Sequence, residues 1–468
     1  MKKWLAIGLL SLWLVWHVAT PIKFTGADLG RYIKNGELLF QGNWDILYKN
    51  FYTYTHPNYP FINHHWFFGV ICFVIWHVFD FVGLSLAYVA LILLTFWLFF
   101  KEAKHLSSFS VACVFGLLAF PLIACRSEIR PEGVSMFFCA LFLWLANLYQ
   151  LKRLKAIHLN IWLSLIQIIW VNTHIFFGLG PVLIATFWLQ AKINLNKEEA
   201  HDLKGTIGLL LGACLINPSG VSGALAPFNA LKGLGVSISE DQNVFFMLQR
   251  FHDLLYPYFL ITLPILIFPW VVLVKKDGIK KHLSFLILIF LFSLAAIEKI
   301  RFITPYGYFF IPLSCYAWEQ LMQKWSASLK EKVLCSFLLL GILASVLINF
   351  DSNKNPYFGL APGVNNAAEF YKRSGLTGTI FNNYDIGGYL IFYLSPQHKF
   401  FINNEVDAFP TSFFTNIYIP MQINENVWKK LESKYRFNVI FFARHEQTDW
   451  WGHLFITRRL EDASWCPV

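Results

Sequence analysis

Asp28 lies in a polar stretch, residues 26–37, that begins a few residues after the first apolar run of the chain. A carboxylate there could act as a general base on an acceptor hydroxyl or amine, or orient the acceptor beside a phosphate leaving group. Gly26 and Gly30 flank Asp28 and would let the backbone approach a ligand closely. Because Asp is also favoured just before a helix, capping of a helix over residues 29–39 is the alternative interpretation.

Residues 50–66 form a dense run of aromatic and hydrogen-bonding side chains, which is typical of a surface for sugars and phosphates. The candidate binding residues in this run are Tyr54, His56, Asn63, His64 and His65. An aromatic belt at a membrane interface would explain the tyrosines and Trp66, but not two adjacent histidines. The histidine pair could also join Asp28 or Asp80 at a divalent metal, but the spacing defines no ligand set, so we assign no metal.

Four charges occupy the seven residues 126–132, namely Arg126, Glu128, Arg130 and Glu132. The planar guanidinium fork suits phosphate, so the two arginines are candidate ligands for a lipid phosphate or pyrophosphate. Arg301 is a third candidate, which could hold a phosphate or balance Glu298. Internal ion pairing is the alternative for such a short charged turn.

Two further polar segments, residues 170–174 and 216–220, follow apolar runs. Asn172 and His174 in the first are candidate substrate-binding residues, although capping and turn chemistry would explain either segment. The long stretch 218–254 contains Glu240 and Asp241 and is the best candidate for a mobile lid.

Membrane helices must position these residues, because the chain is 56% hydrophobic and only 14% charged, with a mean hydropathy of +0.49. Each crossing needs roughly 20 apolar residues as a helix. We predict about eleven spans, at residues 4–22, 83–100, 108–125, 133–150, 157–172, 175–191, 205–217, 255–274, 283–297, 302–320 and 333–350.

The apolar run 61–80 is ambiguous, because it carries three histidines and Asp80 among bulky aromatics. If it does not cross, most of the Lys and Arg residues before residue 351 lie on the cytoplasmic side, whereas a crossing would leave only a minority there. The positive-inside rule therefore predicts that 61–80 is an outer juxtamembrane element. The N-terminus is then cytoplasmic, and the first outer loop covers residues 23–82.

The remaining composition excludes other classes of protein. The net charge of +10 accompanies no basic stripe of the kind that binds nucleic acid, and the eight cysteines form neither a disulfide framework nor a zinc spacing. The predicted span centres contain almost no ionisable groups, which disfavours a lipid or solute transporter. A non-catalytic membrane assembly subunit stays open as a further alternative.

After residue 350 the long apolar runs stop, and residues 351–468 read as a separate outer domain. Strands are predicted at 378–382, 399–403 and 437–442, and helices at 364–373 and 428–435. The fold class is therefore mainly α: a polytopic membrane domain over residues 1–350, followed by a small α/β domain.

Taken together, these motifs resemble the GT-C superfamily of integral membrane glycosyltransferases, which includes protein mannosyltransferases, aminoarabinose transferases and oligosaccharyltransferase catalytic subunits. The likeness is greatest to uncharacterised bacterial members and runs along nearly the whole chain. It is carried by short motifs, namely Asp28 to Arg31, Tyr54 to Trp66, Arg130 to Glu132, Asn172 to His174, Asn217-Pro218 and Asn383 to Leu390.

The resemblance implies transfer of a sugar from a polyprenyl-phosphate carrier to an extracytoplasmic lipid, glycan or protein, usually with inversion, in a bacterial inner membrane. Asp28 would be the essential acid, assisted by a carboxylate such as Asp80, Glu128 or Glu132, and Arg31 is a candidate substrate-binding residue. Two departures from the family pattern stand out. Ala27 precedes Asp28 where many relatives have paired acids, and Asn403-Asn404-Glu405 stands where an Asp-Gly-Arg is expected.

Overall fold

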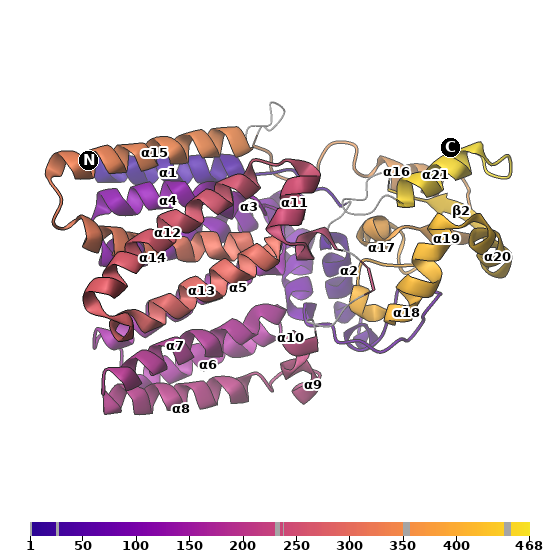
Figure 1. Ribbon diagram of the computed structural model, residues 1–468. Helices are drawn as coiled ribbons and strands as arrows, with labels where there is room; N and C mark the ends of the chain where they lie inside the picture. The colour runs from indigo at the N-terminus through magenta and orange to yellow at the C-terminus, as the bar shows by residue number, and fades with distance from the viewer. Residues whose placement is uncertain (1, 25–27, 230–234, 237, 350–355, 444–450) are drawn as a thin grey trace.

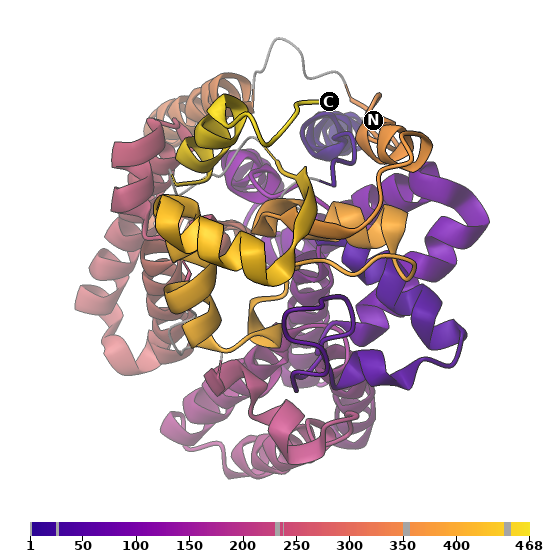
Figure 2. The ribbon, with the colours of Figure 1, turned by 90° about the vertical axis from the view of Figure 1, so that its right-hand side faces the viewer.

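The computed structural model describes residues 2–24, 28–229, 235–236, 238–349, 356–443 and 451–468. These residues form a bundle of long helices with a smaller unit at one end (Figure 1). Viewed from that end, the C-terminal segments lie across the ends of the bundle helices (Figure 2). The mainly α fold class predicted from the sequence is confirmed.

Each predicted span overlaps a helix of the bundle. These helices are α1 (Lys2–Val18), α3 (Trp66–Leu106), α4 (Phe109–Ala124), α5 (Pro131–Gln150), α6 (Ala156–Val171), α7 (Leu179–Ile193), α8 (Lys197–Ala213), α12 (Leu255–Asp277), α13 (Leu283–Glu298), α14 (Ile303–Met322) and α15 (Ala327–Asn349). Among the described residues, six helical segments are long and apolar enough to cross a membrane, and α1, α4 and α6 are apolar but shorter. The number of eleven spans therefore stays a prediction.

The core of the bundle is built around α14, whose side chains are buried without a break from Pro305 to Cys315. This helix packs against α4, α3 and α12. The contact with α4 is close, because a Cβ on Gly307 would lie 2.8 Å from the Cβ of Leu122. Since α4 ends and α14 begins at the same end of the bundle, the charged residues that flank them are brought together.

Within the ambiguous segment 61–80, α3 begins at Trp66, and this helix breaks at Asp80, where φ is 56°. Before the break, Phe68 and Cys72 are buried in a cluster with α2 (Leu29–Phe40), not with the core of the bundle. The residues just before the break, Val78 and Phe79, are exposed. This packing agrees with a juxtamembrane element, although its place relative to the bilayer stays a prediction.

Helix α2 lies across the end of the bundle (Figure 1), held closely by neighbours on two sides. A Cβ on Gly36 would lie 2.6 Å from the Cβ of Phe73 in α3, so the two helices touch through this glycine. A Cβ on Gly30 would lie 3.0 Å from the Cβ of Phe392 in α17 (Gly387–Leu394). The helix that follows Asp28 is thus fixed between the membrane bundle and the C-terminal part.

The C-terminal part contains a two-stranded parallel sheet, formed by β1 (Thr379–Asn382) and β2 (Phe437–Phe441). Its helices are α16 (Asn366–Arg373), α18 (Thr411–Phe413), α19 (Ile419–Ile423), α20 (Glu425–Tyr435) and α21 (Trp451–Glu461), in addition to α17. The predicted strand at 399–403 is reduced to isolated bridges at Phe400. The side chain of Asn382 replaces a strand partner there, since its Oδ1 accepts from the N–H of Phe401 (3.0 Å) and its Nδ2 donates to the carbonyl of Ile402 (2.8 Å).

Gly36→Ala tests the close contact between α2 and α3. We expect the free energy of unfolding to fall by about 1–3 kcal/mol, because the added methyl group has no space against Phe73 and Gly69. Thermal unfolding in detergent would measure this loss. The matched control is Gly208→Ala in α8, where an added Cβ has no heavy atom within 4 Å. Equal melting temperatures for the two variants would contradict the described contact.

Candidate active site

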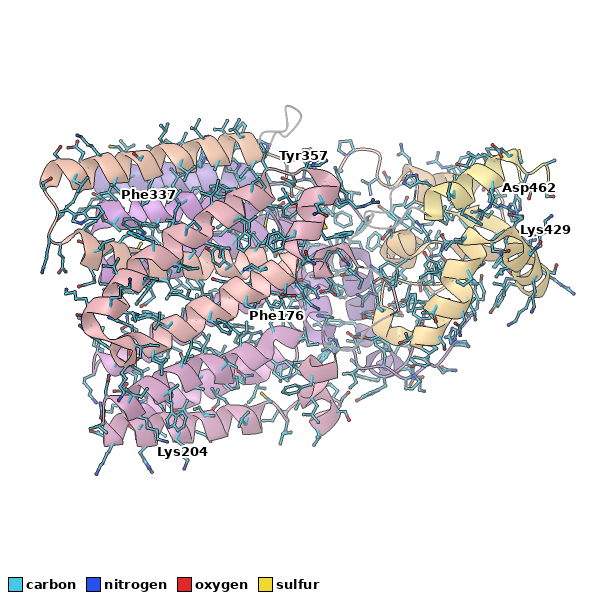
Figure 3. All side chains as sticks on the ribbon, in the orientation of Figure 1. Phe176, Lys204, Phe337, Tyr357, Lys429 and Asp462 are labelled. Carbon is cyan, nitrogen blue, oxygen red and sulfur yellow. The ribbon has the colours of Figure 1, made fainter. Side chains whose placement is uncertain are left out.

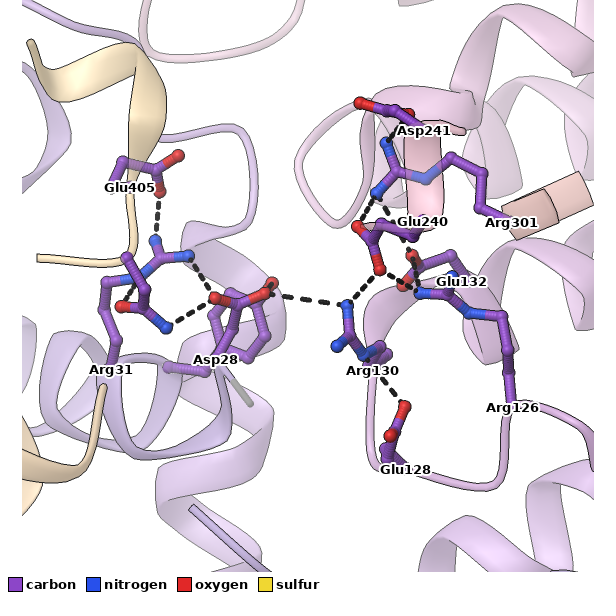
Figure 4. Close-up of polar contacts among 12 residues, drawn as sticks. Asp28, Arg31, Arg126, Glu128, Arg130, Glu132, Glu240, Asp241, Arg301 and Glu405 are labelled. Carbon is purple, nitrogen blue, oxygen red and sulfur yellow. Dashed lines mark hydrogen bonds and ion pairs between the residues drawn. The ribbon is translucent and has the colours of Figure 1, made fainter. Parts of the chain in front are cut away.

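Asp28 stands at the first position before α2, but its carboxylate makes no capping hydrogen bond to that helix. Its Oδ1 accepts a hydrogen bond from the Nδ2 of Asn404 (2.6 Å) and lies 3.3 Å from the Nη2 of Arg31. Its Oδ2 accepts from the hydroxyl of Tyr32 (3.4 Å). The carboxylate is therefore held by side chains from two distant parts of the chain, as Figure 4 shows.

Arg31 connects Asp28 to the C-terminal part. Its guanidinium is buried, donates from Nε to the Oδ1 of Asn404 (3.2 Å) and forms an ion pair with Glu405. Burial raises the pKa of Glu405 to about 7, and the adjacent Arg31 opposes that rise. An arginine in this setting needs such partners, because a buried charge without one would cost several kcal/mol.

Asn404 and Glu405 are themselves held in place by neighbouring polar groups. The Oδ1 of Asn403 accepts from the N–H of Glu405 (2.9 Å), and the hydroxyl of Tyr384 donates to the carbonyl of Asn404 (3.2 Å). Gly387 leaves room for this segment, since a Cβ there would lie 2.7 Å from the nitrogen of Asn404. These contacts present the Asn404 amide to Asp28.

A second group of charges gathers where α4, α5 and α14 meet. Arg126 and Arg130 come from the loop between α4 and α5, and Arg301 lies in η5 (Ile300–Phe302), just before α14. All three guanidinium groups point at Glu240, which η3 (Ser239–Asp241) carries. The Oε2 of Glu240 accepts from Arg126 (2.7 Å) and Arg130 (2.9 Å), and its Oε1 pairs with Arg301.

Further carboxylates surround this arginine cluster, which we define as Arg126, Arg130 and Arg301. Glu132 accepts from Arg126 (3.2 Å), and Asp241 lies 3.3 Å from both Arg301 and Lys299. Glu128, at the exposed rim, lies 3.3 Å from Arg130. Burial tends to raise the pKa of Glu240, but the arginines outweigh it and hold that pKa well below its usual range. Glu240 is therefore ionised at neutral pH.

Arg130 joins the two groups of charges, because its Nη1 lies 3.9 Å from the Oδ2 of Asp28. A small cavity lies beside the arginine cluster and is lined in part by residues of α3, α5 and α14. Five charged residues line its polar end, namely Arg126, Glu128, Arg130, Glu132 and Arg301. Its apolar wall includes Tyr88, Ile92, Met136 and Tyr308. A carboxylate, several guanidinium groups and an apolar cavity thus meet at one end of the bundle.

Three histidines form a row of rings that reaches Tyr32, whose hydroxyl donates to Asp28. The rings of His64 and His65 are 5.0 Å apart, those of His65 and His174 are 5.4 Å apart, and His65 also contacts Tyr32 (5.6 Å). Burial lowers the pKa of His174 to about 3 and lowers that of His65 well below its usual value. These two rings are therefore neutral at physiological pH.

The tautomer of His174 follows from its hydrogen bonds. The indole Nε1 of Trp170 donates to the hydroxyl oxygen of Ser135 (2.8 Å), and that hydroxyl lies 2.8 Å from the Nδ1 of His174. The Ser135 hydroxyl can then donate its proton to Nδ1, which leaves the ring proton on Nε2.

Several candidate residues have other surroundings. Asp80 is exposed at the helix break, where its Oδ1 accepts from the N–H of Phe81 (2.7 Å). Tyr54 donates to the carbonyl of Ile380 (2.8 Å), and His56 packs against the rings of Phe409 and Phe413. The Nδ2 of Asn63 donates to the carbonyl of Ile46 (3.2 Å), and the Nδ2 of Asn172 donates to the carbonyl of Ile168 (2.8 Å). The contacts of Tyr54 and Asn63 hold the first outer loop in place. A catalytic role for Asp80 and a substrate-binding role for the other four residues stay predictions.

The residues around Asp28 do not fit a metal site. Within the described part of the chain, no group of three or more His, Cys, Asp or Glu side chains is arranged to hold a metal ion. The groups that face the Asp28 carboxylate are the Nδ2 of Asn404, the Nη2 of Arg31 and the hydroxyl of Tyr32, which act as hydrogen-bond donors to it.

Sequence reasoning missed Asn404, Glu405, Tyr32 and Tyr88 as parts of this site, and it placed Glu240 only in a lid. One signal was present, since Asn403-Asn404-Glu405 was noted as a departure from the expected motif. Nothing in the local pattern connects these residues to Asp28, which lies more than 370 residues earlier in the chain.

Comparison with solved structures gives the fold a known counterpart. The oligosaccharyltransferase of the archaeon Archaeoglobus fulgidus, in complex with an inhibitory peptide and a dolichol-phosphate, is 12% identical to this chain, with a TM-score of 0.63. The alignment covers 94% of this chain and 69% of that one. The apo form of the A. fulgidus enzyme has a TM-score of 0.60 at 12% identity, with the same coverage. Its complex with Zn and sulfate has a TM-score of 0.56 at 12% identity and covers 93% of this chain and 67% of that one.

No protein-family model and no curated protein matches the sequence. The mainly α fold that the resemblance implies is confirmed, because this chain has the fold of the A. fulgidus oligosaccharyltransferase. At 12% identity the likeness defines the fold, while activity has to be argued from the site.

The neutral His174 predicts a pH dependence of stability. Its pKa is about 3 in the folded protein and near 6.5 when unfolded, so the unfolded chain binds the extra proton first as the pH falls. We expect the melting temperature to drop between pH 6.5 and 5, with His174 contributing up to about 1.4 kcal/mol per pH unit. Thermal unfolding of His174→Asn should show a shallower slope in this interval. Parallel slopes for wild type and variant would contradict the assignment.

Proposed function

We propose that the protein is a membrane glycosyltransferase that moves a sugar from a polyprenyl-phosphate-linked donor to an extracytoplasmic acceptor. The observation that carries this proposal is the 3.9 Å approach of Asp28 to Arg130, a member of the arginine cluster. A potential base and a potential phosphate-binding group thus stand side by side at the end of an apolar bundle. The proposal includes the division into a catalytic membrane domain, residues 1–350, and an outer domain, residues 351–468.

In the proposed reaction, Asp28 accepts the proton of an acceptor hydroxyl or amine, or orients that group, as it attacks the anomeric carbon of the sugar. The bond between that carbon and the phosphate oxygen breaks, and its electron pair leaves with the lipid phosphate. Arg130 and Arg301 stabilise the negative charge that grows on the phosphate. Attack opposite the leaving group inverts the anomeric carbon.

The residues that line the cavity support a lipid phosphate as the leaving group. Its polar end is lined by arginines, and its apolar wall is lined by Ile92 and Met136 of bundle helices. A phosphate at the polar end would place the start of a polyprenyl chain beside apolar side chains. The A. fulgidus oligosaccharyltransferase has the same fold and was solved with a dolichol-phosphate in one case and with sulfate in another, which supports an oxyanion site.

The distribution of charge supports the outward orientation. Lys204 lies towards the end of the bundle opposite to the C-terminal part, where Lys429 and Asp462 are found (Figure 3). Loops rich in Lys and Arg, such as residues 152–155 and 275–281, connect helices at that opposite end. Under the positive-inside rule this end faces the cytoplasm, so the site, the first outer loop and the C-terminal part face away from the cytoplasm. The bacterial inner membrane is the proposed location.

Asp28→Asn tests the proposal directly. We expect transfer from a radiolabelled polyprenyl-phosphate sugar to fall by at least 100-fold, because the amide cannot accept the acceptor proton. Binding of the donor should persist, since the arginine cluster is unchanged. Transfer is measured in membranes that contain the full chain.

Asp45→Asn is the matched control. Asp45 lies in the same outer loop and is exposed, and its carboxylate forms an ion pair with Lys49 at 3.0 Å. We expect its transfer rate to stay within about twofold of wild type, as exposed ion pairs contribute little. A transporter or an assembly subunit would show no such transfer in any variant, and full activity of Asp28→Asn would refute the catalytic role.

A further inference from the structure

Glu240 lies at the centre of the arginine cluster and contacts three arginines, whereas a structural ion pair requires only one. Both of its carboxylate oxygens are used, Oε2 by Arg126 and Arg130 and Oε1 by Arg301. The three arginines come from two separate loops, yet all converge on one anion. Such convergence of guanidinium forks is the arrangement that binds phosphate oxygens.

The cluster also has more donor groups than Glu240 uses. The Nε groups of Arg126 and Arg301 are buried and have no hydrogen-bond partner within the described part of the chain. A carboxylate offers two oxygens in one plane, whereas a phosphate offers up to three non-bridging oxygens in a tetrahedron. The site is therefore better matched to a phosphate than to its present occupant.

The charge balance points the same way. If η3 moved away, both Glu240 and Asp241 would leave together, because they are adjacent in the turn. The arginine cluster and Lys299 would then face Asp28, Glu128 and Glu132, which leaves a net charge of about +1 by simple counting. A phosphodiester donor carries about one negative charge and a released phosphomonoester nearly two, so either is sufficient to neutralise this excess.

The turn is attached to the bundle mainly by polar contacts, which a competing anion can replace. Besides its ion pairs, the carbonyl of Gln242 accepts from the N–H of Ile300 (3.0 Å). On its other side, Ile238 packs against the hydrophobic cluster of the C-terminal part. The turn therefore spans the space between the bundle and the C-terminal part.

We propose that Glu240 is an internal competitor for the donor phosphate and sets the affinity of the site for it. This inference rests on the proposed function. The donor phosphate displaces the Glu240 carboxylate from the arginine cluster, one monoanion for another. The leaving phosphate becomes a dianion and binds the arginines more strongly than the donor did, which favours the transition state. When Glu240 returns, it helps to expel the product.

Glu240→Gln tests the inference, with farnesyl phosphate as a short probe of the lipid phosphate and the full-length protein in detergent. The substitution keeps the shape of the side chain and removes the competing charge. We expect farnesyl phosphate to bind at least tenfold more tightly than to wild type, as measured by equilibrium titration. Glu240→Asp, which keeps the charge on a shorter side chain, should give an intermediate affinity.

Glu369→Gln is the matched control, since it removes the same charge from an exposed residue that pairs with Arg373 at 3.2 Å, outside the arginine cluster. We expect its affinity to change by no more than about threefold, because exposed pairs are screened by solvent. Arg301→Gln should weaken binding in the wild-type and Glu240→Gln backgrounds alike.

The outcomes separate the two claims. If wild type and Glu240→Gln bind farnesyl phosphate with equal affinity, or the variant binds more weakly, Glu240 is not a competitor and this inference is wrong, while the proposed function stands. If neither protein binds the probe and Arg301→Gln makes no difference, both the inference and the phosphate site of the proposed function are overturned.

Discussion

The burial of arginine side chains is the constraint on which the outer end of this protein depends. Arg31, Arg126, Arg130 and Arg301 are largely removed from water, and each is neutralised by acids from other segments. Removing one partner from such a pair typically costs about 3–5 kcal/mol, because the remaining charge is left buried. The pairs therefore act as long-range links: Arg31 ties α2 to Glu405 in the C-terminal part, and Arg126 ties the α4–α5 loop to Glu240.

These links also explain why α2 is packed so closely. A carboxylate can serve as a base only if its position is reproducible to within a fraction of an ångström. Gly30 and Gly36 bring α17 and α3 into contact with opposite ends of α2, while Asn404 and Tyr32 hold the Asp28 carboxylate itself. The membrane bundle thus supplies the arginines, the C-terminal part supplies Asn404, and α2 carries the acid between them.

The sequence predicts the fold better than the site because the two depend on signals of different range. Each bundle helix coincides with an apolar run, since a bilayer-length hydrophobic segment is a local signal. Asp28, Arg126, Arg130 and Arg301 were likewise recognised from charge placed beside such runs. The partners Asn404 and Glu405 could not be identified, because their pairing with Arg31 joins residues more than 370 positions apart. The missing strand near Phe400 has the same origin, as the Asn382 side chain takes over bonds that a strand pattern assigns to backbone.

The geometry of the two charge groups places a condition on any reaction between them. Asp28 and Arg130 are 3.9 Å apart, a distance that leaves no room for a substrate. During the reaction, the nucleophile, the anomeric carbon and the phosphate must all fit between the base and the arginine. With hydrogen bonds of about 3 Å and an attack distance of about 3 Å, the base and the arginine would then be roughly 8–10 Å apart. If Asp28 is the base and the arginine cluster holds the phosphate, the described arrangement is a closed resting state. In that state, the ion pairs among these residues hold the site together, and the substrates must break them in order to bind. The binding energy of the lipid and the sugar therefore has to replace these ion pairs before the reaction can begin.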